Sequence, residues 1–115
     1  MKILNQQKID ELAGEIGQEN VPVLLNIFLG ELNSYVDALT SGTLVDIPKY
    51  LAETSHALKS SAASFGADRL CGFAIDIDAR AKDSGLVNVA EDLETILGLL
   101  RETETEYQSL LVKLG

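Results

Sequence analysis

The spacing of apolar residues is the feature of this chain that most restricts its fold. Apolar side chains recur every three or four residues along four long segments, which places them on one face of an α-helix. The longest such pattern consists of Val21, Leu24, Leu25, Phe28, Leu32, Tyr35, Val36 and Leu39. The run from Val21 to Leu29 alone is also typical of a buried strand, but the helical spacing continues too far for one.

Capping residues and prolines divide the chain into five predicted helices. The first is short and lies between Asn5 and Gly17, and the four longer ones start at Asn20–Pro22, at Asp46–Pro48, at Asp68 and after Asn88. Gly66 and Gly85 are expected to close two of them. Short connections favour antiparallel neighbours. We therefore expect a single all-α domain over residues 1–115, an antiparallel up-and-down four-helix bundle with the short N-terminal helix covering one end.

Composition narrows the class of protein further. Only six residues are aromatic, which argues against an all-β fold, and 18 acidic residues against nine basic ones argue against a nucleic-acid surface. The single cysteine, Cys71, excludes an internal disulfide. Neither a signal pattern nor an apolar run of about 18 residues is present. We expect a cytoplasmic monomer that binds proteins or small molecules and neither nucleic acid nor membranes.

The only histidine, His56, lies opposite the apolar stripe of its predicted helix, about 170° from the centre of the stripe. Its outer face is shared with Ala52, Ser60 and Ala63, and Lys59 follows one turn later. Surface helices usually carry long polar side chains at such positions, so these small residues leave the imidazole accessible to a second macromolecule.

An accessible imidazole with a neighbouring cation is suited to capture a phosphoryl group. A neutral ring offers a lone pair to phosphorus, and an ammonium group such as that of Lys59 can balance the negative charge of the product. The same position is, however, more often that of an ordinary solvated histidine, and position alone leaves this alternative open.

The residues that follow His56 resemble the motif of the histidine phosphotransfer (Hpt) domain family. His56-Ala57-Leu58-Lys59 is followed by small residues, then by Phe65-Gly66-Ala67 and Leu70, as in that motif. Many members have glycine where this chain has Ser60. The segments Leu4–Ile9 and Asn20–Leu25 are similar to those of free-standing phosphotransfer proteins in bacterial quorum-sensing relays.

The resemblance implies a stoichiometric phosphocarrier, not an enzyme. His56 would accept a phosphoryl group, through the ring nitrogen farther from the backbone, from the receiver domain of a hybrid sensor kinase. It would then pass the group to the receiver domain of a response regulator. Lys59 would orient and neutralise the phosphate, and Ser60 and Ala63 would provide clearance. The chain would need no cofactor or metal of its own, because the magnesium ion would belong to the receivers.

Charge is distributed unevenly around the motif. Residues 49–82 contain five basic and four acidic residues, whereas the other positions contain four basic and fourteen acidic ones. A nearly neutral face would avoid repulsion from an acidic receiver pocket, although chance clustering explains the counts equally well. Within that segment, Asp76 and Asp78 are expected to be solvated and Cys71 to be a packed thiol.

Other chemistries find little support. No acid is expected beside His56 to complete a serine triad with Ser55, and no glycine-rich nucleotide motif is present, so the chain should not use ATP. One histidine and one cysteine do not make a zinc site of the usual kind. The main alternative is a helical interaction module that binds receiver domains without carrying phosphate, and a small-molecule enzyme is a weaker one.

Overall fold

The computed structural model describes residues 1–114 and confirms the predicted all-α architecture. The helices are α1 (Gln6–Ile16), α2 (Val21–Thr40), α3 (Ile47–Phe65), α4 (Asp68–Asp83) and α5 (Val89–Leu114), and a 3₁₀ turn (Gln18–Asn20) joins α1 to α2. Among these residues, no helix combines the length and the apolar character needed to cross a membrane.

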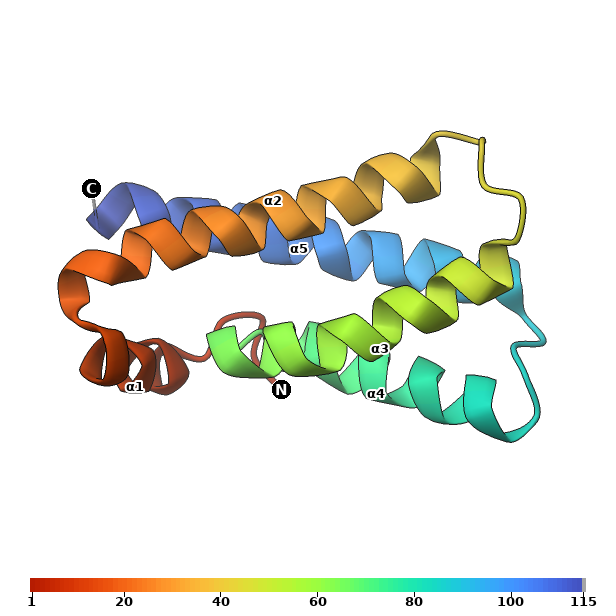
Figure 1. Ribbon diagram of the computed structural model, residues 1–115, viewed down its shortest axis with the longest axis horizontal. Coiled ribbons are helices and arrows are strands. Elements are labelled where there is room, and N and C mark those ends of the chain that lie inside the picture. Colours follow the sequence, from red (N-terminus) through yellow and green to blue (C-terminus); the bar gives the residue numbers. More distant parts are fainter. Residues whose placement is uncertain (115) are drawn as a thin grey trace.

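Helices α2 to α5 run alternately in opposite directions along a body of 42 × 27 × 19 Å (Figure 1). The pair α3–α4 packs most extensively, followed by the pair α2–α5. The short helix α1 lies at one end of the bundle and contacts α2 and α3 (Figure 1). This arrangement is the predicted up-and-down bundle with an extra N-terminal helix.

Side-chain caps fix two helix starts as predicted. Asn20 also precedes α2 as predicted but its side chain does not cap the helix, and the expected cap Asp68 is wrong by one residue. The carboxylate of Asp46 accepts from the N–H of Lys49 (3.1 Å), and the side chain of Asn5 accepts from the N–H of Gln7 (3.1 Å). Asn20 makes no such bond and donates to the carbonyl of Ile16 instead. Asp68 is the first residue of α4 and not its cap, because its carboxylate accepts from the Asn5 amide (3.0 Å).

The turn between α3 and α4 is held tightly. Gly66 takes a left-handed conformation (φ 75°), and its carbonyl accepts from the backbone N–H of Asn5 (2.8 Å). The Tyr107 hydroxyl on α5 donates to the carbonyl of Phe65 (2.6 Å). The Phe65 ring stacks on that of Phe28 at 4.5 Å. The C-terminal end of α3 is therefore fixed by contacts with α2, α5 and the N-terminal segment.

The core consists of the apolar stripes of all five helices. Fully buried side chains include Leu25, Leu32, Leu51, Leu58, Leu70, Ile77, Ile96 and Leu100. On α3, Leu51, Leu58 and Ala62 face inward as the spacing predicted, which directs the opposite face of that helix to the exterior.

Candidate functional site

His56 lies on the outer face of α3, beside the seam between α3 and α4. Its side chain is 65% exposed. Ser60 and Ala63 on the same face are also exposed, and Ala52 is half-buried. The structure therefore places the predicted small residues around the imidazole, and no bulky side chain of α3 covers it on this face.

The carboxylate of Asp78, on α4, lies directly beside this imidazole. Its Oδ1 is 3.2 Å from His56 Nδ1, and its Oδ2 accepts from Lys59 Nζ at 2.6 Å and from Lys82 Nζ at 2.9 Å. Only 9% of the Asp78 side chain is exposed. The expectations that Asp78 is solvated and that no acid adjoins His56 are both wrong.

Packing explains why the sequence did not reveal this acid. Asp78 follows the core residue Ile77 and stands one turn beyond Ala74, so it lies at the border of the apolar stripe of α4. Helices α3 and α4 are antiparallel neighbours (Figure 1), and their pairing brings the Asp78 carboxylate beside the His56 ring. Spacing within α4 could indicate the border position, but only the pairing shows what the carboxylate meets.

The charges at this cluster determine the state of each group. Hydrogen bonds from the ammonium groups of Lys59 and Lys82 hold the pKa of the Asp78 carboxyl well below its usual range. An ionised carboxylate accepts a hydrogen bond, which assigns the proton of the neutral imidazole to Nδ1. The lone pair is then on Nε2, the nitrogen farther from the backbone.

Comparison with known proteins defines the family. The Hpt domain profile matches residues 23–111. The chain belongs to the Hpt domain family. Phosphorelay protein LuxU of Vibrio cholerae is 56% identical to this Hpt protein over 108 residues, which cover 94% of this chain and 96% of the relative. Phosphorelay protein LuxU of Vibrio harveyi is 55% identical over 107 residues, covering 93% and 94%.

A solved Hpt structure has the same fold. Histidine-containing phosphotransfer protein B from Pseudomonas aeruginosa PAO1 superposes with a TM-score of 0.81 over 96% of each chain, at 17% sequence identity. The comparisons confirm the family resemblance, and they place this chain among phosphotransfer proteins of phosphorelays rather than among kinases.

Two further side chains near the Hpt motif do not take part in the cluster. The Ser55 hydroxyl is buried and has no hydrogen-bond partner among residues 1–114, so it does not form a triad with His56 and Asp78. The Cys71 thiol is half-buried beside the carbonyl of Lys59, and burial raises its pKa. A raised pKa disfavours the thiolate, which is consistent with the packed thiol that the sequence predicted.

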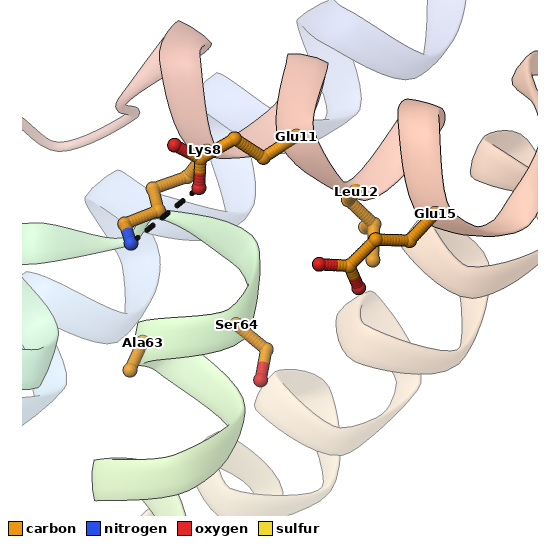
Figure 2. A pocket seen from close by; sticks show the side chains of 6 residues that line it. All are labelled: Lys8, Glu11, Leu12, Glu15, Ala63 and Ser64. Atoms are coloured by element: carbon orange, nitrogen blue, oxygen red, sulfur yellow. Dashed lines mark ion pairs between the residues drawn. The ribbon is translucent and has the colours of Figure 1, made fainter.

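A separate hollow lies between α1 and the C-terminal part of α3 (Figure 2). Lys8, Glu11, Leu12, Glu15, Ala63 and Ser64 line a volume of about 200 Å³. Lys8 and Glu11 form an ion pair of 3.6 Å across its α1 side. Ala63 thus lies between this hollow and the face of His56, so a larger residue at position 63 would alter both.

The basic residues of the nearly neutral segment lie in different places. Lys59 and Lys82 adjoin His56, whereas Arg80 turns to α5 and binds both carboxylate oxygens of Asp92 at 2.9 Å. Arg69 lies 3.5 Å from Glu102, also on α5. The charges of Arg80 and Arg69, two of the five basic residues of that segment, are therefore paired with acids of α5.

Proposed function

We propose that this Hpt protein carries a phosphoryl group on Nε2 of His56 between receiver domains of a two-component phosphorelay, as its sequence similarity implies for a quorum-sensing relay. The observation that supports the proposal most directly is an exposed imidazole whose Nδ1 faces the buried carboxylate of Asp78. This arrangement directs the nucleophilic nitrogen to the exterior, where a partner can present a phosphoryl group.

The chemistry needs only one bond to form and one to break. The Nε2 lone pair attacks the phosphorus of an aspartyl phosphate on the receiver, and the P–O bond to that aspartate breaks as its carboxylate leaves with the electron pair. The ring keeps its Nδ1 proton and gains a positive charge. Asp78 stabilises that charge from 3.2 Å, and the second receiver reverses the step by attack of its own aspartate on phosphorus.

Other residues around His56 position the phosphoryl group. Lys59 donates to Asp78 at 2.6 Å, and its ammonium group has further N–H donors for phosphate oxygens, so it can bind both. Ser60 and Ala63 leave space for the receiver on the same face. We assign the magnesium ion to the receiver. Among residues 1–114, no three histidine, cysteine or carboxylate side chains are grouped to hold a metal.

Incubation with a receiver that carries radiolabelled phosphate tests the proposal. We expect label on the wild-type protein that is stable in alkali and labile in acid, as a phosphoramidate is, and no label on His56→Gln. Glu94→Gln is a matched control, because Glu94 is exposed on α5, lies outside the hollow beside His56 and has no ion pair among the described residues. Label that persists in His56→Gln would contradict the proposal. Receiver binding without any label would support the interaction module instead.

A further inference from the structure

Lys82, which lies outside the Hpt motif around His56, also contacts the site. Its Nζ donates to Asp78 Oδ2 at 2.9 Å, and the same oxygen accepts from Lys59 Nζ at 2.6 Å. Two ammonium groups thus share one carboxylate oxygen, while Oδ1 faces the imidazole. The lysines come from different helices and lie 23 positions apart in the sequence.

The charges of this cluster do not balance before phosphorylation. Lys59 and Lys82 bring two positive charges, Asp78 brings one negative charge, and the imidazole is neutral in its Nδ1-protonated form. Like charges that share one oxygen repel each other, so one ammonium group is held less firmly than it would be in an isolated pair. These hydrogen-bonded groups have one positive charge in excess before a phosphate arrives, and a further acid, Glu53, lines the hollow beside His56 without bonding to either lysine.

The backbones of the two lysines lie on opposite sides of His56 along α3, although their ammonium groups meet at one oxygen of Asp78. Lys59 stands one turn toward the C-terminal end of α3. Because α4 is antiparallel to α3, Lys82, one turn beyond Asp78, lies toward the N-terminal end of α3 (Figure 1). There an open hollow of about 480 Å³ is lined by Ala52, Glu53, His56, Asp78, Ala81 and Lys82.

Exposure indicates which lysine can move. The side chain of Lys82 is 62% exposed, against 32% for Lys59, so Lys82 can leave Asp78 for the hollow with little loss of packing. If Lys82 leaves, Asp78 keeps its bonds to Lys59 and to the imidazole, so the buried carboxylate retains partners.

From this geometry we infer that Lys82 is a second cation for the phosphoryl group on His56. Its ammonium group leaves the Asp78 carboxylate and binds phosphate oxygens instead. The inference rests on the proposed phosphorylation of His56. The ammonium group of Lys82 contacts the phosphoryl group from the side opposite Lys59, and the excess positive charge of the cluster stabilises the phosphoryl dianion.

The test uses potassium phosphoramidate as a small phosphoryl donor, so that receiver docking does not enter. Wild-type protein, Lys82→Gln, Lys82→Arg and Lys49→Gln are phosphorylated, and the phosphohistidine ³¹P resonance is followed against pH. Lys49 is an exposed lysine on the same side of α3, about 10 Å from His56 along the helix, and controls for long-range charge. The pKa of the imidazole is measured in the unphosphorylated proteins as well.

We expect the pKa of the phosphoryl group to rise by about half a pH unit in Lys82→Gln, because a nearby cation favours the dianion. Lys82→Arg and Lys49→Gln should match the wild type. An unchanged phosphoryl pKa in Lys82→Gln would overturn the inference while the phosphorylation of His56 stands. The inference would also be overturned if Lys82→Gln raised the phosphoryl pKa and changed the imidazole pKa of the unphosphorylated protein by the same amount. Lys82 would then act on the ring through Asp78 and not on the phosphoryl group. Wild-type protein that takes no phosphoryl group on His56 would contradict the proposed function itself.

Discussion

At the scale of single residues, the two nitrogen atoms of the His56 ring have different surroundings. Nδ1 faces the Asp78 carboxylate at 3.2 Å, and Nε2 is left to the exterior. A partner that fixes the proton on one nitrogen selects the nitrogen that reacts, and it also holds the ring against rotation. Asp78 is therefore expected to control both the orientation and the charge of the reacting ring.

Asp78→Asn should slow phosphoryl transfer from a receiver to His56. An amide can accept from Nδ1–H but carries no charge to stabilise the phosphorylated ring, so we expect a rate about 10- to 100-fold lower in rapid-quench measurements. Asp76→Asn is the control, because Asp76 lies on the same helix and its side chain is 57% exposed. Equal rates for the two variants would contradict the role of Asp78.

The Asp78 carboxyl should also make stability depend on pH. Its pKa is lowered in the folded state by Lys59 and Lys82, so the ionised group stabilises the fold above the ordinary carboxyl pKa of about 4. That contribution is lost as the pH falls toward the lowered pKa. We expect the free energy of urea unfolding of the wild type to exceed that of Asp78→Asn at pH 7, with the difference shrinking below about pH 4. A constant difference would contradict this origin.

Sequence reasoning identified His56 and Lys59 because they are neighbours on one helix, where spacing determines direction. It counted Lys82 only as one charge of the nearly neutral segment and did not place Asp78 beside His56, because the approach of these residues depends on which helix packs against α3 and in which register. Turn residues predicted that α4 exists. The periodicity within α4 does not show which residues of another helix a side chain at the border of its apolar stripe, such as Asp78, will contact.

At the scale of elements, α3 combines a buried stripe with an outer face of small side chains. The buried stripe holds the helix in place. The side chains of Ser60 and Ala63 are short, so they project little from the surface beside His56. Under the proposed function, a receiver approaches this face closely enough for its aspartyl phosphate to reach Nε2 of His56. The outer face should therefore tolerate changes of polarity better than increases in size.

Ala63→Leu should reduce transfer from a receiver without unfolding the protein. Ala63 is exposed, so the larger side chain adds no strain to the core but projects into the face that the receiver must approach. We expect the apparent affinity for the receiver to fall about tenfold or more in binding and transfer measurements. Ala90→Leu, at an exposed position in the first turn of α5, controls for added apolar surface and should behave as wild type. Equal loss in both variants would argue against a clearance role.

Replacement of glycine by alanine should change the free energy of unfolding in opposite directions within helices and at the turn between α3 and α4. A Cβ on Gly30 or Gly98, both within helices, would meet no atom within 4 Å, and each substitution should raise the free energy of unfolding by about 0.5–1 kcal/mol. At Gly66 (φ 75°) a Cβ would stand 2.7 Å from the carbonyl oxygen of Asn5. Gly66→Ala should therefore lower the free energy of unfolding by more than about 1 kcal/mol. Chemical denaturation measures all three, and a stabilised Gly66→Ala would contradict the structure of this turn.

At the scale of the whole molecule, the proposed phosphorylation site is a single histidine on one face of the bundle. The bundle buries the opposite side of α3, so donor and acceptor receivers have to reach His56 from the same direction. The helix order, the bundle and the inward residues followed from apolar spacing and caps. The seam that forms the site required three-dimensional packing, because long-range pairing is not encoded in local periodicity.

Two receivers should consequently compete for this protein. In a binding experiment with a labelled donor receiver, an unlabelled acceptor receiver should displace it completely, and the apparent Kd of the donor should rise in proportion to the acceptor concentration. A ternary complex with both receivers bound and His56 still reactive would contradict a single shared face.

The shared carboxylate oxygen of Asp78 also has a consequence for how such a chain can diverge. Lys59 and Lys82 both donate to that oxygen, so replacement of the acid alone would leave two neighbouring cations without it beside His56. Substitutions at positions 59, 78 and 82 are therefore expected to be correlated among related proteins. In proteins that have a neutral residue at position 78, we expect the lysine at position 59 or 82 to have been replaced earlier. Reconstructed ancestral sequences give the order of these substitutions.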